Sequence, residues 1–251
     1  MNAPGMGAEE GVVGPALVER FVAAMPAMLS DLEALVVCES PSADQDAVRR
    51  SAEIVAGQGE RALGVAPEVI VLDGCTHLRW RLGDGPRRVL LLGHHDTVWP
   101  IGSLERHPWS VTDGVIRGPG CFDMLTGLVQ IFYALGELGR IGHDLDGVTV
   151  LVTGDEEIGS PSARALIEAE AAGCDAVFVL EASADGGAIK AGRKGASRYS
   201  VRVHGRAAHA GLEPQHGINA TVELAHQVLA IAGLGDEAAQ TSVTPTVVQA
   251  G

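Results

Sequence analysis

The sequence predicts an α/β fold in which a sheet is sandwiched by helices. Two observations support this fold class. Helical and strand-like segments alternate between residues 89 and 181, the βαβ rhythm that is typical of such sheets. Two of the strand-like segments, 89–93 and 148–154, are apolar runs of the kind expected for buried strands. The composition agrees, because 46% hydrophobic and 20% charged residues favour a folded core over global disorder.

The segments that precede the first buried strand form a helical layer and a strand pair. Residues 1–14 are glycine-rich and read as a loose leader. Helical spacing of apolar residues follows, with Pro26 marking a kink or a new first turn, and Asp44 is an N-cap candidate. The predicted helices cover 15–37 and 44–63, and the predicted strands cover 67–72 and 77–82.

The central part supplies the alternating elements, and the pattern changes near Gly195. The predicted strands are 89–93, 148–154 and 176–181, and the predicted helices between them are 126–138 and 162–172. Beyond Gly195 the sequence predicts a strand with one solvent-exposed face at 197–205, a helix at 219–232 and a further strand at 242–249. We therefore expect two domains, 1–195 and 196–251, and we expect the C-terminal domain to be incomplete.

Composition excludes several classes of partner. A net charge of −14 argues against a nucleic-acid surface, which needs a basic patch. The four cysteines form no CxxC pair and suit free thiols in a reducing compartment. The N-terminal segment lacks the basic and apolar regions of a signal peptide. No apolar run of about 18 residues occurs, so no membrane span is predicted. We expect a cytoplasmic protein with no nucleic-acid or membrane partner.

A histidine and an aspartate follow the most hydrophobic strand. In the motif Gly93–Val98, residues two apart along a continued strand point the same way, which places Asp96 beside His94. Asp96 can then hold one ring nitrogen and leave the other for a metal. The alternative is a strand-end turn with an incidental histidine pair.

Acidic residues end the other predicted segments. The glycine-punctuated motif Gly118–Asp123 places Asp123 near a helix N-terminus, and taken alone Asp123 reads as an N-cap. Asp155, Glu156 and Glu157 follow a buried strand, where like charges are costly without a cation, although a solvated acidic loop is the alternative. Glu181 ends the next strand.

Together these residues predict a metal site. The ends of successive strands converge on one edge of a parallel sheet. Mixed nitrogen and oxygen ligation of this kind indicates a Zn²⁺ or Mn²⁺ site rather than a structural site built from thiolates. Two cations bridged by a carboxylate, with a spare glutamate as base, make a hydrolytic centre. A Rossmann-type nucleotide binder is the competing α/β reading, but no GxGxxG motif opens a helix after the first strand.

The ordered motifs resemble those of the co-catalytic zinc hydrolase family. That family includes glutamate carboxypeptidase, acetylornithine deacetylase, succinyl-diaminopimelate desuccinylase and aminoacylase. The motifs that carry the resemblance are GHHDTV, GPGCFDM, TGDEEIGS, the Glu181 segment and GRAAHAGLEPQHGINA, in matching order and spacing from about Val89 to Asn219. Among the branches of this family, the motifs most resemble those of the glutamate carboxypeptidases. The resemblance implies a zinc-peptidase-like catalytic sheet and the start of a ferredoxin-like lid or dimerisation domain.

The resemblance also implies a role for each motif residue. His94 binds one metal, Glu157 is a ligand of one metal and Glu181 a ligand of the other. Asp123 bridges both metals, and the peptide bond after Asp123 is cis. Asp96 orients His94, and Glu156 is the general base. His209 corresponds to a lid histidine that stabilises the transition state, across the dimer in dimeric relatives.

The function implied is two-metal hydrolysis of an amide bond in an N-acyl amino acid or small peptide, by a carboxypeptidase or deacylase. The cofactor implied is two Zn²⁺ per site, with Co²⁺ or Mn²⁺ as substitutes, and the complete protein is expected to be a homodimer through its lid. The run Met124–Gly127 departs from the Lys and paired glycines of many relatives. A second terminal histidine ligand and a substrate-binding arginine have no counterpart before Gly251, so the alternative expectation is a catalytically impaired fragment or pseudoenzyme with partial metal binding.

Overall fold

The computed structural model describes residues 14–250, so the predicted leader lies almost wholly outside the described residues. The chain divides into two units, Met1–Lys190 and Ala191–Gly251, which are described separately below. The division falls near the boundary predicted at Gly195. The assignment of 1–195 to a catalytic domain and 196–251 to a lid domain stays a prediction.

The first unit is built on a five-stranded sheet with the order β1-β2-β6-β3-β7. The strands are β1 (Glu68–Leu72), β2 (Cys75–Leu82), β3 (Val89–His94), β6 (Val148–Thr153) and β7 (Ala176–Val179). β3 lies between β6 and β7 and is parallel to both, with Leu91 opposite Val150 on one side and Phe178 on the other. β2 is antiparallel to β1 and β6. The sheet is therefore mixed, and its parallel part contains the three strands that lead into the acidic motifs.

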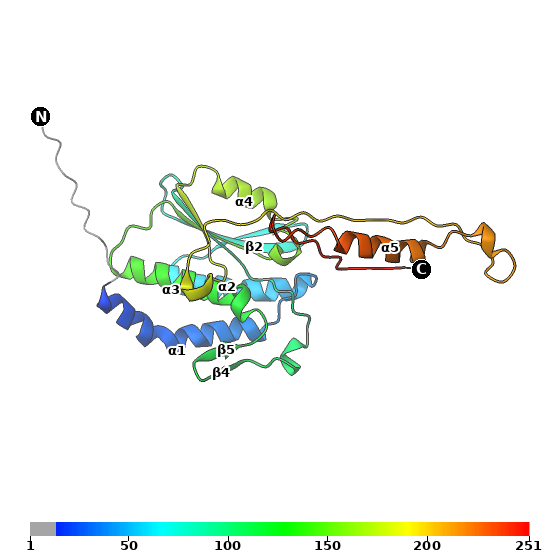
Figure 1. Cartoon of the computed structure of the whole chain (residues 1–251). Helices are drawn as coiled ribbons and strands as arrows, with labels where there is room; N and C mark the ends of the chain where they lie inside the picture. Colours follow the sequence, from blue (N-terminus) through cyan, green and yellow to red (C-terminus); the bar gives the residue numbers. More distant parts are fainter. Residues whose placement is uncertain (1–13, 251) are drawn as a thin grey trace, which may run out of the picture. The chain divides into compact units, whose positions relative to one another are not determined.

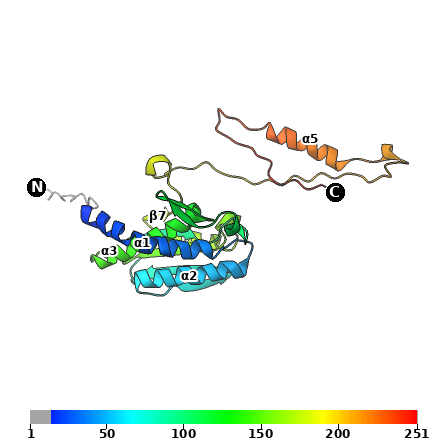
Figure 2. The ribbon, with the colours of Figure 1, turned by 90° about the horizontal axis from the view of Figure 1, so that it is seen from below.

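Helices cover both faces of this sheet, as predicted (Figures 1 and 2). One face carries three helices, α1 (Pro15–Val37), α2 (Gln45–Leu63) and α3 (Thr126–Arg140). The other carries α4 (Arg164–Ala171), whose Glu170 pairs with Arg79 and Arg81 of β2. Alternation along β2 explains both layers, because Leu78 and Trp80 belong to the core beneath the three helices while the arginines between and after them point the other way.

Local sequence signals fix the positions of α2 and α3. Asp44 caps α2 through its Oδ1, which accepts the Ala47 N–H at 3.0 Å, and this confirms the predicted N-cap. Gly64 ends the helix in the left-handed conformation. The rings of Trp80 and Phe132 meet edge to face, with centroids 5.2 Å apart, where α3 packs on the sheet.

The segment Cys121–Arg140 is long and apolar enough to cross a membrane. It instead packs on the sheet, because Leu128, Val129 and Phe132 are almost fully buried in the core of the first unit. Its length and composition are therefore those of a core helix, and it is the one stretch of this kind in the described part of the chain.

A hairpin that the sequence analysis did not predict joins β3 to the Asp123 motif. Its strands are β4 (Ser110–Thr112) and β5 (Val115–Arg117). Asp113 and Gly114 connect them with φ values of 53° and 74°. Two consecutive residues with positive φ make the tight turn that an Asp-Gly pair favours. With three residues in each strand, the hairpin carries too little hydrophobic alternation to be detected.

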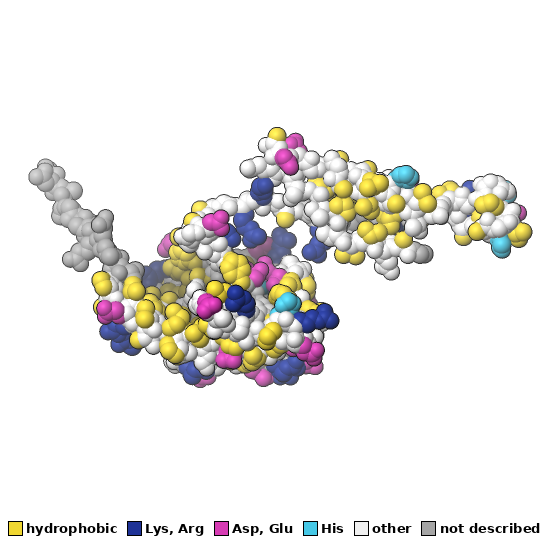
Figure 3. Space-filling view, turned by 60° about the horizontal axis from the view of Figure 1, so that its bottom comes forward, with side chains coloured by type: hydrophobic (Ala, Val, Ile, Leu, Met, Phe, Trp, Pro, Cys, Tyr) yellow, Lys and Arg dark blue, Asp and Glu magenta, His cyan; other side chains and the backbone are white. Residues whose placement is uncertain are grey.

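The second unit contains the predicted helix, α5 (Ala220–Ala232), whose N-cap Asn219 accepts the Val222 N–H. The strands predicted at 197–205 and 242–249 are not formed, and both segments run as unpaired chain (Figure 1). A strand needs a neighbour for its N–H and C=O groups, and neither segment finds one among the described residues. The apolar side chains over α5 are correspondingly exposed (Figure 3), including Val222 and Leu229.

Candidate metal centre

Four segments that are distant in the sequence meet at the carboxyl ends of the parallel strands. His94 ends β3, Glu156 and Glu157 follow β6, and Glu181 follows β7. Asp123 enters from the turn that precedes α3. Strand direction explains the convergence, because parallel strands present their carboxyl ends at one edge. Of the predicted site residues, all those in the first unit are brought together here: His94, Asp96, Asp123, Glu156, Glu157 and Glu181.

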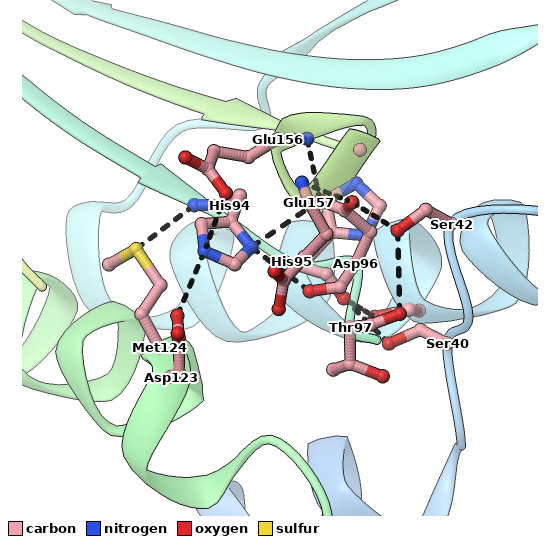
Figure 4. A network of polar contacts seen from close by, with 12 residues as sticks. Ser40, Ser42, His94, His95, Asp96, Thr97, Asp123, Met124, Glu156 and Glu157 are labelled. Atoms are coloured by element: carbon pink, nitrogen blue, oxygen red, sulfur yellow. Dashed lines mark hydrogen bonds and ion pairs between the residues drawn. The ribbon is translucent and has the colours of Figure 1, made fainter. Parts of the chain in front are cut away.

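His94 is at the centre of these residues and is only 1% exposed. Its Nε2 lies 3.3 Å from an oxygen of Asp123 and 3.7 Å from an oxygen of Glu156 (Figure 4). The same atom lies 3.3 Å from an oxygen of Glu181. None of these approaches forms a hydrogen bond with good geometry, so Nε2 is a buried polar atom without a hydrogen-bond partner. An atom of this kind surrounded by carboxylates is a strong indication of a cation site.

The other ring nitrogen fixes the tautomer of His94. Nδ1 lies 2.9 Å from the backbone oxygen of Asp96 and 3.4 Å from its carboxylate. Both are acceptors, so Nδ1 carries the proton and donates it to Asp96. In the neutral ring Nε2 is then the unprotonated nitrogen, so it is the atom that can bind a metal among the acidic residues once the ring has lost its second proton.

Two overlapping sets of ligands have the spacing that a metal needs. One contains His94, Asp123 and Glu157, and the other contains His94, Glu156 and Glu181, with the ligand atoms of each set within 4.8 Å of one another. A single Nε2 binds one cation, so a second cation here depends on carboxylates. The residues present therefore fit a centre with mixed nitrogen and oxygen ligands, and zinc is well suited to such a set.

The charges of the site are mutually dependent. Burial by itself lowers the pKa of His94, but contact with Asp96 and Glu181 outweighs it and raises the value to about 11. Burial raises the pKa of Asp123, Glu156 and Glu157, and neighbouring carboxylates raise each of them further. Carboxylates this close disfavour one another's charged form, and a divalent cation among them reverses that effect.

The turn that holds Asp123 is irregular. Asp123 has extended φ and ψ values of −125° and 101°, and α3 is capped by Leu125 without a side-chain hydrogen bond. The reading of Asp123 as an N-cap was therefore wrong, because its side chain points to His94 instead of to the helix. The Asp123–Met124 peptide bond is cis, as the family resemblance implied.

Asp96 is completely buried and connects several residues of the site through hydrogen bonds to its carboxylate. Its Oδ1 accepts the Glu156 N–H at 3.1 Å, and its Oδ2 accepts the Glu157 N–H at 3.2 Å. Its Oδ2 also accepts the Ser42 hydroxyl at 2.6 Å (Figure 4). Burial alone raises the pKa of Asp96, but contacts with His94 and Ser42 bring it below its usual value. Asp96 thus stays ionised and holds both the histidine and the turn of the two glutamates.

Two residues at the site were not predicted from the sequence. Ser42 comes from the loop between α1 and α2, and the Met124 sulfur accepts the His94 backbone N–H at 3.2 Å. Gly93 leaves room for that sulfur, because a Cβ on it would lie 3.2 Å from Met124 Sδ and 2.8 Å from its methyl group. No local sequence pattern marks the contact of Ser42 with Asp96 or the contact of Met124 with His94. The only indication for Met124 was its place next to Asp123 in the sequence.

A second buried cluster lies behind the acidic turn and contains Cys75, His77 and Asp155. His77 Nδ1 accepts the Gly154 N–H at 3.2 Å, so the ring proton is on Nε2, which faces the Ser162 hydroxyl at 3.0 Å. Both ring nitrogens are thus engaged. Burial, with help from nearby acidic groups, raises the pKa of the Cys75 thiol to about 11, so it stays protonated. The contacts of the cluster are those of a hydrogen-bonded support for the turn, in which Asp155 Oδ2 accepts the Ser162 hydroxyl at 2.7 Å.

His209 belongs to the second unit and is exposed. Its Nδ1 accepts the Gly211 N–H at 3.1 Å, which holds the ring on a tight turn. The role implied for His209 remains a prediction.

Comparison with known proteins agrees with this geometry. Residues 90–249 match the model of the peptidase family M20/M25/M40. The chain belongs to this family. Carboxypeptidase G2 of Pseudomonas sp. (strain RS-16) is 31% identical over 96% of the chain, and succinyl-diaminopimelate desuccinylase of Methylorubrum extorquens (strain PA1) is 33% identical over 51%. The match covers 61% of the length of the carboxypeptidase and 37% of the length of the desuccinylase.

Solved structures of similar proteins share this fold. An M20 family metallo-carboxypeptidase from Sulfolobus solfataricus matches with a TM-score of 0.52 at 20% identity, over 63% of this chain and 37% of that one. Human carnosine dipeptidase 1 matches with a TM-score of 0.55 at 19% identity, over 64% of this chain and 39% of that one. The predicted α/β architecture and the family resemblance, including its carboxypeptidase branch, are confirmed.

Proposed function

We propose that the protein is a metal-dependent hydrolase that cleaves an amide bond in an N-acyl amino acid or a small peptide, as a carboxypeptidase or deacylase. The observation that carries the proposal is the buried Nε2 of His94, which has no hydrogen-bond partner and faces the carboxylates of Asp123, Glu156 and Glu181. Membership of the M20 family and likeness to a carboxypeptidase and a desuccinylase support it.

We assign the cation as Zn²⁺, with Co²⁺ and Mn²⁺ as substitutes and two ions per complete site. His94 and Glu181 would hold one ion and Glu157 the other, with Asp123 shared between them. Bound cations in such a site supply Lewis acidity and lower the pKa of coordinated water. In the neutral ring, contact with Asp96 holds the proton on Nδ1 and leaves Nε2 as the nitrogen that can bind a metal.

Glu156 is the proposed general base. Its side chain is 47% exposed, so solvent and substrate reach it, and its backbone is fixed by the hydrogen bond to Asp96. Burial and nearby carboxylates raise its pKa, which brings it closer to neutral pH and suits a group that takes a proton from water and returns it to the leaving amine. We assign His209 to stabilisation of the oxyanion, and the second unit to a lid and homodimer interface. Cytoplasmic localisation remains part of the proposal.

Metal analysis and product detection together test this function. The protein is stripped with chelator, reloaded with Zn²⁺, and incubated with a panel of N-acyl amino acids and dipeptides while released amine is measured. The proposal predicts retained zinc and release that depends on it. A chain that retains no zinc after gel filtration contradicts the metal centre, whereas a loaded chain that releases no amine from any of them contradicts the reaction and favours the non-catalytic alternative.

A further inference from the structure

The Asp96 carboxylate connects three separate parts of the first unit. It contacts the ring of His94 at the end of β3, and it accepts the backbone N–H groups of Glu156 and Glu157 beyond β6. Its remaining partner is the hydroxyl of Ser42, 54 residues away in the sequence. The rotation of the Asp96 carboxylate about its Cβ–Cγ bond decides whether it can accept the Glu156 N–H and the Glu157 N–H at the same time. The position of these two glutamates therefore depends on the orientation of one buried side chain.

The backbone around Ser42 is held against Asp96 by its own pairing. Pro41 and Thr97 form an isolated parallel bridge, in which the Ser42 N–H bonds to Thr97 O at 3.2 Å and the Thr97 N–H bonds to Ser40 O at 2.8 Å. This pairing fixes the Ser42 side chain beside the carboxylate. Its hydroxyl then donates to Oδ2 at 2.6 Å, the shortest of the hydrogen bonds to this carboxylate.

We propose that Ser42 is a positioning residue of the metal centre, which acts through Asp96 to hold Glu156 and Glu157 at His94. This inference rests on the proposed function. The terminal torsion of an aspartate has broad wells, so a carboxylate without a strong partner on one oxygen is free to rotate. The longer hydrogen bonds from the Glu156 N–H to Oδ1 and from the Glu157 N–H to Oδ2 would then lose their alignment. Ser42 removes that freedom by fixing Oδ2.

The same loop offers a matched control. Ser40 is also buried, at 1% exposure, and its hydroxyl donates to the backbone oxygen of His95 at 2.6 Å. Ser40→Ala therefore removes a hydroxyl and a hydrogen bond of the same length, but leaves the Asp96 carboxylate untouched. Ser42→Thr keeps a hydroxyl at the critical position. The two comparisons separate positioning of the site from general stability of the loop.

The experiment measures the apo-protein and its affinity for Co²⁺ alone. We expect Ser42→Ala to shift the amide resonances of Glu156 and Glu157 in the apo-protein and to weaken Co²⁺ binding by about tenfold, the lower range for loss of a group that orients a metal ligand. The visible spectrum of bound Co²⁺ should change with it. Ser42→Thr should restore both readings, and Ser40→Ala should change neither.

The possible failures are distinct. Unchanged amide resonances and unchanged Co²⁺ affinity in Ser42→Ala overturn the inference while leaving the proposed function intact. Equal effects of Ser40→Ala and Ser42→Ala also overturn it, because they assign the effect to loop stability. A wild-type chain that binds no Co²⁺ overturns the proposed function and this inference with it.

Discussion

At the scale of single residues, Glu156 and Glu157 are neighbours in the chain with different proposed roles. Glu157 is a proposed metal ligand, while Glu156, the more exposed of the pair, is the proposed general base. We expect Glu156→Gln to retain metal and to lose activity by about 10²- to 10⁴-fold, the usual contribution of a general base. Zinc content and the rate of amine release check both parts.

The control for this substitution is Glu168→Gln, since Glu168 is exposed on α4 and pairs only with Arg164 among its described contacts. It should change neither reading. Turnover by Glu156→Gln at the wild-type rate would contradict the base assignment.

The fully buried His95 makes a contribution to the stability of the metal-free protein that is sensitive to acid. Burial lowers the pKa of His95 to about 4, whereas an unfolded histidine has a pKa of about 6.5. Because the folded value is depressed, the stabilising contribution is present above pH 6.5 and is lost as the pH falls. Between pH 7.5 and pH 5, His95 binds a proton in the unfolded state but not in the folded state. This difference lowers the free energy of unfolding by about 2 kcal/mol.

Urea unfolding of chelator-treated protein at the two pH values measures this loss. The matched variant is His95→Leu, which removes the titrating group. It is expected to be less stable at both pH values, because it loses the hydrogen bond to Thr76 O, but to lose about 2 kcal/mol less than wild type on acidification. An equal loss in both proteins would show that His95 does not titrate in this way.

Sequence reasoning worked for residues marked by their own motif and failed for those defined by contacts. His94, Glu156 and Glu181 lie at the carboxyl ends of three parallel strands, so their convergence was predictable from strand direction. Asp123 as an N-cap was the reading that a local pattern favours, and tertiary contact with His94 overrode it. Ser42 lies in a loop with no periodic signal, and its role depends on a bridge between distant segments.

At the scale of elements, the close contact between α3 and the end of β7 fixes the position of Glu181. Gly127 permits it, because a Cβ at this position would lie 2.0 Å from the backbone oxygen of Leu180. We expect Gly127→Ala to displace the segment that carries Glu181, to lower the free energy of unfolding by roughly 1–3 kcal/mol, as overpacking of a core does, and to weaken metal binding.

The matched control is Gly57→Ala in α2. A Cβ at Gly57 meets only the flexible end of Arg61, at 3.9 Å. This substitution should stabilise the protein by about 0.5–1 kcal/mol, because alanine favours a helix over glycine, and should leave metal affinity unchanged. Chemical unfolding and zinc competition assays measure both variants. A Gly127→Ala protein as stable as wild type would refute the close packing.

Elements with strong periodicity or buried apolar runs were predicted well, and short or partner-dependent elements were not. α1 spans the residues that its apolar spacing predicted, and the capping aspartate placed the start of α2. The β4–β5 hairpin is too short to carry a pattern. The strand predicted at 197–205 has the right alternation, but a strand requires a neighbour, which alternation cannot supply.

At the scale of the whole molecule, the first unit contains the complete set of converging residues. Its hydrophobic core runs from Leu32 in α1 to Val152 in β6, whereas none of the described residues of the second unit is buried. Folding and metal binding should therefore reside in the first unit. Trypsin tests this, because Lys190, Arg193 and Lys194 lie in an exposed segment without regular structure where the units divide.

Limited digestion is expected to cut at these residues first and to leave a fragment that ends near Lys190. That fragment should keep the thermal midpoint of the intact chain and bind Zn²⁺ with affinity within about threefold, since His94, Asp123 and Glu181 all remain and their supporting contacts are internal to it. Mass spectrometry identifies the cut, and calorimetry and zinc competition measure the fragment. A fragment that unfolds, or that loses zinc affinity by a larger factor, would show that the second unit contributes to metal binding. The lid role proposed for His209 predicts a contribution of the second unit to catalysis and none to metal binding.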